Sequence, residues 1–513
     1  MKETGANKWI ITLAVMTGTL MSVLDASIVN VALPYMRGNL GASIEEITWV
    51  ITGYILSTVI MMPLASLLSS RFGRKRFYIF SVFLFTISSI LCGMSWNMSS
   101  LVTFRIIQGI GGGSLIPLSL AIIRETFPRE EQGTAMGIYG LGVVLGPAFG
   151  PTLGGWLINH YSWPWIFYIN VPVGIISIIM VRRFIQDPPY LKREKGKIDF
   201  IGLGLLIVAL GTLQIMLEKG RQNNWFESDL IKYLALISLT GILLFIWREL
   251  TIDKPAVNLR ILKDINFASG TLIGGILGIG LYGSLFLLPM FLQLLMGYSA
   301  LSSGIALIPR SIAMAITMPL AGKLYNRAGP RLLIGTGLIV SAISFWEFSH
   351  LSLNVNLWGL FFPQFWQGVG FGLIFIALTT ASLSTIKKPE MTAATGLYGV
   401  VRQLFGSIGI AIVATKLAGG ENSYRAILGG NVTNFRDITS KWLNMLTGAM
   451  LNKGADPVTA HHQALRILDG GIIRQAAMLA YNHVFFLITG LFVISIPLIF
   501  LLKTGREFIK KTP

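Results

Sequence analysis

Charged residues are scarce in this chain. Lys, Arg, Asp and Glu together make up 12% of its 513 residues, whereas hydrophobic residues make up 53%. Soluble globular proteins carry about a quarter charged residues, so this composition excludes an ordinary soluble domain. Cysteine is nearly absent as well. Cys92 is the only one in the sequence, and a single thiol excludes an intramolecular disulfide.

Long apolar runs take the place of the missing charges. Segments of roughly 20 mainly apolar residues recur along the whole chain, and each is long enough to cross a hydrocarbon core of about 30 Å. This pattern predicts an all-α, polytopic membrane protein. The fourteen predicted spans are 9–34, 46–69, 76–95, 101–123, 136–157, 165–182, 199–217, 230–248, 267–292, 301–324, 331–348, 356–381, 395–416 and 482–502.

Basic residues give the chain a formal net charge of +18, and their placement decides what that charge means. They crowd alternate connections between spans, while the intervening connections hold few. This asymmetry is typical of the positive-inside rule, so it argues against nucleic-acid binding and predicts that both termini are cytoplasmic. The basic connections are RFGRKR (71–76), RETFPRE (124–130), the segment 182–197, NRAGPR (326–331), IKKPE (386–390) and the tail KTGREFIKK (503–511).

The two halves of the chain repeat each other. PLASLLSSRFGRKR (63–76) aligns with PLAGKLYNRAGPR (319–331) at an offset of 256, and QGIGGG (108–113) aligns with QGVGFG (367–372) at an offset of 259. Six spans before residue 183 and six after residue 266 leave two spans between the repeats. An even number of spans per repeat makes the halves parallel, related by an axis along the membrane normal. The predicted 6+2+6 organisation has a bundle at 1–182, linker spans at 183–265 and a bundle at 266–513.

Asp25 is the only acid in the first span, where a carboxylate is costly. At 1.5 Å per residue, Asp25 lies about 24 Å from the inner end of its span, and Arg105 lies about 6 Å below the outer surface. These depths coincide in a core of about 30 Å, so the side chains are expected to meet. An ion pair favours the carboxylate and an apolar cavity favours the protonated acid. A site alternating between the two would bind and release a proton; the alternative is a static pair that orients the helices.

Four motifs carry a family resemblance. LDASIVNVALP (24–34), RIIQGIGGG (105–113), GVVLGPAFGPTLGG (142–155) and WPWIFYINVPVG (163–174) resemble the signatures of the fourteen-span drug:proton antiporters of the major facilitator superfamily, in particular their EmrB-like branch. The third is the most specific, and the likeness runs over essentially the whole chain. It implies the major-facilitator fold and a proton-coupled exporter of hydrophobic drugs, with no enzymatic activity and no cofactor other than the proton gradient.

The antiporter motif and a further family motif, between the second and third spans, concern conformational change. The glycines of the antiporter motif recur at near-helical spacing with two prolines, which suits either a tight helix contact or a bending point. The motif at the inner end of the second span departs from the family, because the usual Gly and Asp fall on Ser66 and Ser70. The antiporter motif comprises Gly142, Gly146, Pro147, Gly150, Pro151, Gly154 and Gly155, and the cytoplasmic motif comprises Arg71, Gly73, Arg74, Lys75 and Arg76.

Arg310 and Arg402 lie about nine residues into the second and fifth spans of the second bundle, near the midplane. In the resembled fold these spans line a central cavity. Two cations there favour an anionic or weakly acidic ligand; the alternative is that they pair with backbone carbonyls or helix C-termini. Gln108 and Gln367, which match in the repeat, are expected to bind substrate with them.

The segment 417–480 is the one long connection, and its periodicity predicts helices on the outer face, with a helix starting at Asp456. The resemblance implies that this protein works in a bacterial inner membrane, together with an EmrA-like periplasmic membrane-fusion adaptor and a TolC-type outer-membrane channel. The segment is expected to dock that adaptor, although it could instead cover the protein's own rim or lie on the membrane surface.

Other functions stay open from the sequence. The chain could export an endogenous metabolite such as a fatty acid or a siderophore. A membrane-embedded enzyme and a receptor are alternatives from other classes. No nucleophile–base set, paired catalytic carboxylates or metal-binding cluster is visible in the sequence, which argues against an enzyme. A receptor would not need the two-fold repeat, and without a Walker motif transport would depend on an ion gradient.

Overall fold

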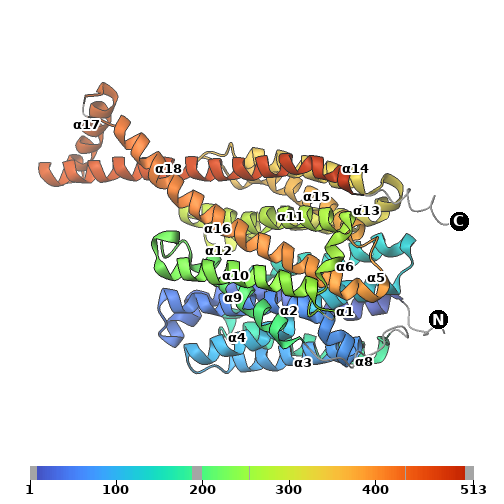
Figure 1. Ribbon diagram of the computed structural model, residues 1–513. Coiled ribbons are helices and arrows are strands. Elements are labelled where there is room, and N and C mark those ends of the chain that lie inside the picture. Colours follow the sequence, from blue (N-terminus) through green and yellow to red (C-terminus); the bar gives the residue numbers. More distant parts are fainter. Residues whose placement is uncertain (1–7, 188–198, 254, 434, 503–513) are drawn as a thin grey trace.

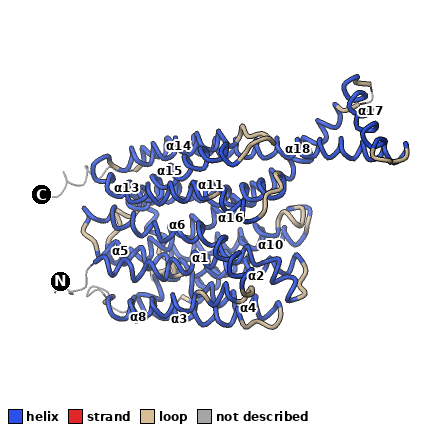
Figure 2. The backbone as a smooth tube through the Cα atoms, turned by 180° about the vertical axis from the view of Figure 1, so that it is seen from behind, coloured by secondary structure: helices blue, strands red, loops and turns tan. Residues whose placement is uncertain are grey.

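The fold is a bundle of long helices, seen in a computed structural model that describes residues 8–187, 199–253, 255–433 and 435–502. No strand occurs among these described residues (Figure 2). The same residues contain 14 helical segments that are long and apolar enough to cross a membrane. The all-α prediction with fourteen spans is therefore confirmed. The basic segment 188–197 and the tail 503–511 lie outside the described residues.

The first six spans form the N-terminal half. Most of them are single helices, but the fourth and sixth are each built from two consecutive helices. The elements are α1 (Lys8–Leu40), α2 (Ile44–Phe72), α3 (Arg74–Gly93), α4 (Met98–Gly112), α5 (Leu115–Thr126), α6 (Arg129–His160), α7 (Trp165–Tyr168) and α8 (Asn170–Phe184).

Two linker helices and six further spans complete the chain. The linker helix α9 packs against α2 and α16, so the linker bridges both halves. The elements are α9 (Phe200–Lys219), η1 (Trp225–Glu227), α10 (Asp229–Thr251), η2 (Leu259–Lys263), α11 (Ile265–Met290), η3 (Phe291–Leu295), α12 (Ala300–Ala306), α13 (Ile308–Ala328), α14 (Pro330–Phe348), α15 (Leu357–Ser382), η4 (Lys388–Glu390), α16 (Met391–Asn431), α17 (Asp437–Asn452), α18 (Pro457–Ser495) and η5 (Ile496–Leu501).

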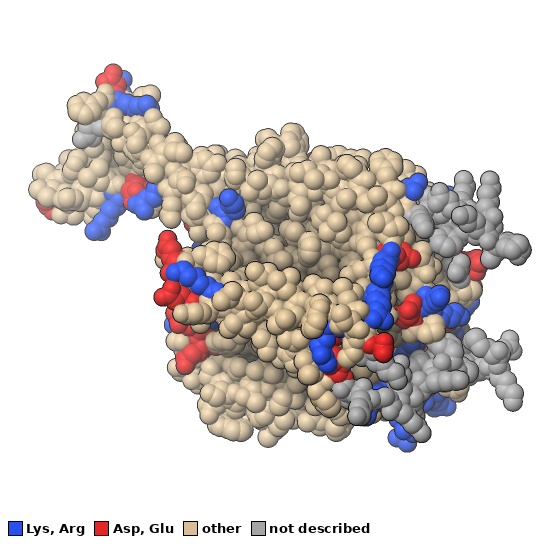
Figure 3. Space-filling model, in the orientation of Figure 1, with Lys and Arg blue, Asp and Glu red and all other residues tan. Residues whose placement is uncertain are grey.

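The bundle has two distinct ends. Helix α1 begins and helix α18 ends toward one of them, here called the terminal end, and α17 projects beyond the opposite end, here called the arm end (Figure 1). Charged side chains gather at the two ends and on the projection, and the visible band between them is almost uncharged (Figure 3). An uncharged belt with charged margins is the surface expected of a protein that spans a bilayer.

The repeat is visible in the backbone at the terminal end. Gly73 separates α2 from α3 with φ 89° and ψ 142°, and Gly329 separates α13 from α14 with φ 81° and ψ 157°. A positive φ of this kind strains any residue with a Cβ. The two glycines match at the offset of 256 found in the sequence, so both halves turn their chain in the same way.

Several spans predicted as continuous are broken in the structure, including the sixth, which is divided between α7 and α8 at Ile169. The fourth span breaks between α4 and α5 at Gly113 and Ser114, and the tenth breaks at Leu307 between α12 and α13. Pro309 stands in the first turn of α13, where its missing N–H has no partner to lose. Hydropathy alone does not reveal these breaks, because the apolar run continues through them.

The predicted outer connection 417–480 is a helical arm. Helix α16 has 41 residues, so it is about 60 Å long and outreaches a hydrocarbon core of about 30 Å. The arm consists of the far parts of α16 and α18 with α17 between them, and it extends away from the bundle in both views (Figures 1 and 2). Asp456 caps α18 by accepting hydrogen bonds from the N–H groups of Val458 and Thr459, at 3.1 and 3.2 Å. The predicted helix start is confirmed.

The halves contact each other closely at the terminal end. A Cβ on Gly133 of α6 would lie 2.5 Å from the carbonyl oxygen of Gly322 of α13, so only glycines allow this approach. Thr395 of α16 also donates a hydrogen bond to the carbonyl oxygen of Pro117 of α5, at 2.9 Å. These contacts close the two halves on each other at the terminal end.

Candidate functional site

Asp25 lies at the centre of a buried polar cluster in the N-terminal half. Its Oδ2 is 2.5 Å from Nη1 of Arg105. Its Oδ1 accepts hydrogen bonds from Nε2 of Gln108 at 3.0 Å and from Nδ2 of Asn170 at 2.9 Å. Asp25 has no exposed surface and Arg105 is 1% exposed. These four residues, here called the Asp25 cluster, join α1, α4 and α8.

Arg105 is held by more than its carboxylate partner. Its Nε donates to the carbonyl oxygen of Val50 at 3.0 Å, and its Nη1 donates to Oε1 of Gln108 at 2.7 Å. Its guanidinium lies 4.3 Å from the centre of the Tyr54 ring. Burying two ions costs several kcal/mol each unless good geometry and further hydrogen bonds offset it. The cluster provides both, so the ion pair inferred from matching depths is present in the structure. Its proton-coupling role stays a prediction.

Asn170 is a member of the cluster that sequence reasoning missed. It is the first residue of α8, is 1% exposed, and also donates to Oγ of Ser89 at 3.0 Å. The available signal was an amide side chain inside the apolar motif 163–174. Gln108, predicted to bind substrate, has its amide oxygen and nitrogen engaged within the Asp25 cluster. Its predicted contact with substrate stays untested by this geometry.

The glycines of the antiporter motif bring α6 against the part of α1 that carries Asp25. A Cβ on Gly146 would lie 2.7 Å from Val23 and 2.9 Å from the backbone nitrogen of Leu24. Gly142, Gly150 and Gly154 make similar close approaches to α1, whereas a Cβ on Gly155 would meet nothing within 4 Å. Pro147 and Pro151 lie inside the unbroken helix α6. The motif therefore forms a tight helix contact, and its role as a bending point stays a prediction.

Arg310 forms a second buried polar cluster, in the C-terminal half. It is 4% exposed and donates from Nη1 to Oγ of Ser284 and to Oε1 of Gln367, both at 3.2 Å. None of the ion pairs among the described residues includes it. In the same part of the chain, both amide atoms of Gln364 and Nε2 of Gln367 have no hydrogen-bond partner. The Arg310 cluster thus buries a positive charge and unsatisfied amide groups, and no carboxylate in the described part of the chain pairs with its arginine.

The two clusters occupy matching positions of the repeat. At the offset of 259, Arg105 corresponds to Gln364 and Gln108 to Gln367. At the offset of 256, Tyr54 corresponds to Arg310. The N-terminal cluster contains an acid that neutralises its arginine. The arginine of the C-terminal cluster, Arg310, lies on α13, which corresponds to α2 and not to α4. No acid among the described residues pairs with it.

Arg402 is separate from the Arg310 cluster. Its guanidinium lies 5.0 Å from the centre of the Phe375 ring, and it is 8% exposed. Phe375 and Gln367 are eight residues apart on α15, which is about 12 Å along a helix axis. The structure therefore brings Arg310 and Gln367 together but places Arg402 at another level.

The cytoplasmic motif supports the junction between the halves. Arg74 is buried at the start of α3, pairs with Glu125 of α5, and donates to Oγ1 of Thr392 at 3.1 Å. Thr392 belongs to α16, so this arginine reaches from the N-terminal to the C-terminal half. Of the other members, Arg71 lies in the last turn of α2, Lys75 bonds to the end of α8, and Arg76 is exposed.

Comparisons with known proteins agree with this architecture. The profile of the Major Facilitator Superfamily matches residues 15–410. The multidrug export protein EmrB of Escherichia coli (strain K12) is 33% identical over 500 residues, which cover 97% of this chain and 96% of that protein. The fatty acid resistance protein FarB of Neisseria gonorrhoeae is 34% identical over 498 residues, covering 96% of each. The human organic anion transporter MFSD10 (TETRAN) has a similar fold, with a TM-score of 0.60 at 14% identity over 96% of this chain and 100% of that one.

Proposed function

The chain belongs to the Major Facilitator Superfamily of membrane transporters, and on that premise we propose that it is a proton-coupled exporter of hydrophobic compounds, preferring weak acids and neutral amphipathic molecules. The observation that carries this proposal is the asymmetry of the two buried clusters. The N-terminal half holds a neutralised Asp25–Arg105 pair. The C-terminal half holds Arg310, which pairs with no carboxylate among the described residues. Members of this superfamily move solutes across membranes and are not enzymes.

Proton coupling is assigned to Asp25. A carboxylate with an arginine partner can exchange that partner for a proton when the helices around it move. Buried hydroxyl groups begin one helical turn from Asp25 and continue toward the terminal end, connected in two groups by hydrogen bonds of 3.0 to 3.1 Å. They provide polar partners along a route to that end. These hydroxyl groups belong to Ser22, Tyr54, Thr19, Tyr139, Ser119 and Tyr78.

The substrate preference is assigned to Arg310 and its neighbours. A buried cation and unsatisfied amide groups are expensive unless a ligand supplies a negative charge and hydrogen-bond acceptors. A carboxylate group of an amphipathic substrate would supply both to Arg310, Gln364 and Gln367. An apolar binding cavity around that carboxylate would impose little restriction on the rest of the molecule, which suits varied substrates.

Proton flux in liposomes that contain the purified protein tests this function. An inward proton gradient is expected to drive efflux of an aromatic weak acid, with proton entry that depends on the substrate. Asp25→Asn should abolish gradient-driven efflux and leave substrate binding measurable, while Asp229→Asn, an exposed acid on α10, should behave as wild type. Full gradient-driven transport by Asp25→Asn would refute proton coupling through this residue.

The anion preference has its own test. Arg310→Gln should weaken binding of an anionic substrate more than binding of a neutral aromatic compound of the same size, because only the anion loses its counter-charge. Arg425→Gln, an exposed arginine on the arm, serves as the matched control. Tighter binding of a permanently cationic dye than of the anion by the wild type would contradict the assignment.

A second candidate function is the export of a fatty acid, favoured by the similarity to a protein named for fatty acid resistance. The same liposomes distinguish the two. A dedicated fatty-acid exporter would show saturable efflux of a long-chain fatty acid and none of structurally unrelated aromatic compounds.

We further propose that the protein lies in a bacterial inner membrane with both termini in the cytoplasm, and that the arm docks a periplasmic membrane-fusion adaptor of an EmrA-like kind, linked to a TolC-type channel. The terminal end, where the halves contact each other, would then be the cytoplasmic side. Support comes from the arm's exposed apolar side chains. They include Ile438, Trp442 and Met445 on α17, which are 73%, 53% and 58% exposed.

Deleting residues 425–470 and joining the ends with a short linker tests this docking. Co-purification of the adaptor and drug resistance of cells should be lost, while transport in liposomes is retained. An adaptor that still co-purifies with the deletion variant would show that the arm is not the dock. Lost transport in liposomes would show that the arm serves the transporter itself.

A further inference from the structure

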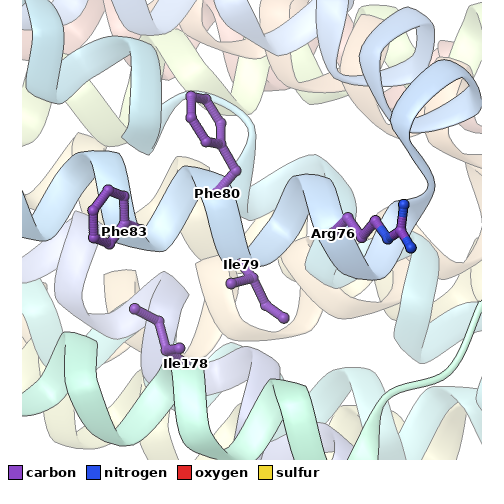
Figure 4. A pocket seen from close by; sticks show the side chains of 5 residues that line it. All are labelled: Arg76, Ile79, Phe80, Phe83 and Ile178. Atoms are coloured by element: carbon purple, nitrogen blue, oxygen red, sulfur yellow. The ribbon is translucent and has the colours of Figure 1, made fainter.

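A furrow lies on the outer face of the N-terminal half, between α3 and α8. These helices form the edge of that half farthest from the C-terminal half (Figures 1 and 2). The furrow has a volume of about 340 Å³, and Ile79 of α3 points toward Ile178 of α8 across it (Figure 4). Its apolar part runs along the membrane-spanning portion of α3, and Arg76 lies in the first turn of α3, at the terminal end. The lining residues are Arg76, Ile79, Phe80, Phe83 and Ile178.

Comparison of the two repeats gives no structural reason for an arginine at position 76. Its neighbour Lys75 donates to the carbonyl oxygen of Arg182 at the end of α8, at 2.6 Å. The matching Arg331 donates to two carbonyl oxygens at the end of the last span, at 2.7 and 3.2 Å. In both halves the basic residue at this position therefore links the start of one helix to the end of another span. The next position is Arg76 in one half and Leu332, 59% exposed, in the other, so the fold does not require an arginine there.

We propose that this furrow binds an anionic phospholipid, with the phosphate on Arg76 and an acyl chain along α3. Arg76 is exposed and has no hydrogen-bond or ion-pair partner within the described ranges. Two more exposed arginines, Arg182 and Arg183, end α8 beside it, and the nearby acid Asp187 accepts a hydrogen bond from the backbone N–H of Lys75 at 2.7 Å. Basic side chains beside a groove between membrane helices are the chemistry that recognises such headgroups.

The dimensions of the furrow suit a lipid better than a small soluble anion. Below Arg76 the exposed side chains Phe80, Phe83 and Ile87 follow one face of α3, and they are 55%, 52% and 40% exposed. Eleven residues of helix from Arg76 to Ile87 span about 16 Å. This is close to half of a hydrocarbon core of about 30 Å, which is the depth of one leaflet. A lipid whose phosphate is bound at Arg76 thus has its acyl chain along the whole face of α3 that Phe80, Phe83 and Ile87 form.

Native mass spectrometry of the full-length protein, titrated with dioleoylphosphatidylglycerol, tests this site. The wild type should retain this lipid more strongly than dioleoylphosphatidylcholine. Arg76→Leu, which installs the residue of the other half, should weaken retention about fivefold, as expected for one basic group at a membrane surface. Arg76→Lys should retain most of the binding. Arg327→Leu, an exposed arginine at the same end in the C-terminal half, should have no effect.

Two further measurements separate the lipid from a free anion and from general charge. Ile178→Trp narrows the furrow without changing charge, so it should reduce retention of the lipid although Arg76 is intact. Millimolar inorganic phosphate should not displace the lipid. Equal retention by Arg76→Leu and Arg327→Leu, wild-type retention by Ile178→Trp, or displacement by phosphate would each overturn the proposal. None of these readouts depends on transport activity.

Discussion

Replacing Asp25 with Asn and Arg105 with Gln, singly and together, measures how strongly the buried pair holds the N-terminal half together. The single variant Asp25→Asn leaves the Arg105 guanidinium, which is 1% exposed, without a counter-charge. Arg105→Gln likewise leaves the fully buried Asp25 carboxylate without a counter-charge. Breaking a buried pair from one side costs about 3–5 kcal/mol. The double variant removes both charges and keeps polar groups of similar size, so it should lose much less than the sum of the two.

The size of the expected coupling follows from the contact distance. With Nη1 and Oδ2 at 2.5 Å, the charge centres are about 4 Å apart, and an effective dielectric constant of about 20 gives an attraction of roughly 4 kcal/mol. Reversible unfolding in mixed detergent micelles measures the free energy of unfolding of the four proteins in the cycle. We expect a coupling energy of about 3 kcal/mol, because Gln108 and Asn170 can partly compensate each single variant.

A neutral control separates charge from hydrogen bonding. Ser89→Ala removes an acceptor of Asn170 in the same buried region, and its loss should cost only about 1 kcal/mol. If the Asp25 and Arg105 substitutions are additive to within about 0.5 kcal/mol, the two side chains behave as independent sites. That result would refute the ion pair as an energetic unit.

Four other variants probe the helix contact, the hydroxyl route and the linker. Gly146→Ala should destabilise the protein by about 1–3 kcal/mol through overpacking against α1, whereas Gly155→Ala should be neutral or stabilising, as thermal unfolding would show. Tyr139→Phe, which removes a hydrogen bond to Thr19, should slow proton release in liposomes without changing substrate affinity. Asp199→Asn should cost about 1.5–3 kcal/mol at neutral pH, because it removes the charged partner of Arg248. The Arg248 hydrogen bonds hold the pKa of the Asp199 carboxyl below its usual range. Its stabilisation is therefore fully present above the usual pKa of an aspartate and should be lost as the pH falls through the lowered pKa, in unfolding measured against pH.

The sequence determined the features that depend on distance along a helix. Apolar runs set the fourteen spans, because each must cover the same hydrocarbon thickness. The offsets of 256 and 259 predicted matching turns, and Gly73 and Gly329 share their backbone conformation. Counting residues from the span ends placed Asp25 and Arg105 at one depth, since the rise per residue is constant.

Only the tertiary structure decided the features that depend on how helices rotate and pack. Asn170 and Gln108 join Asp25 because α4 and α8 turn these faces toward α1, which no count along one helix reveals. Arg310 and Arg402 share a predicted depth but lie at different levels, beside Gln367 and Phe375. Depth is a local property of each helix, whereas the partner of a side chain is set by the contacts between helices.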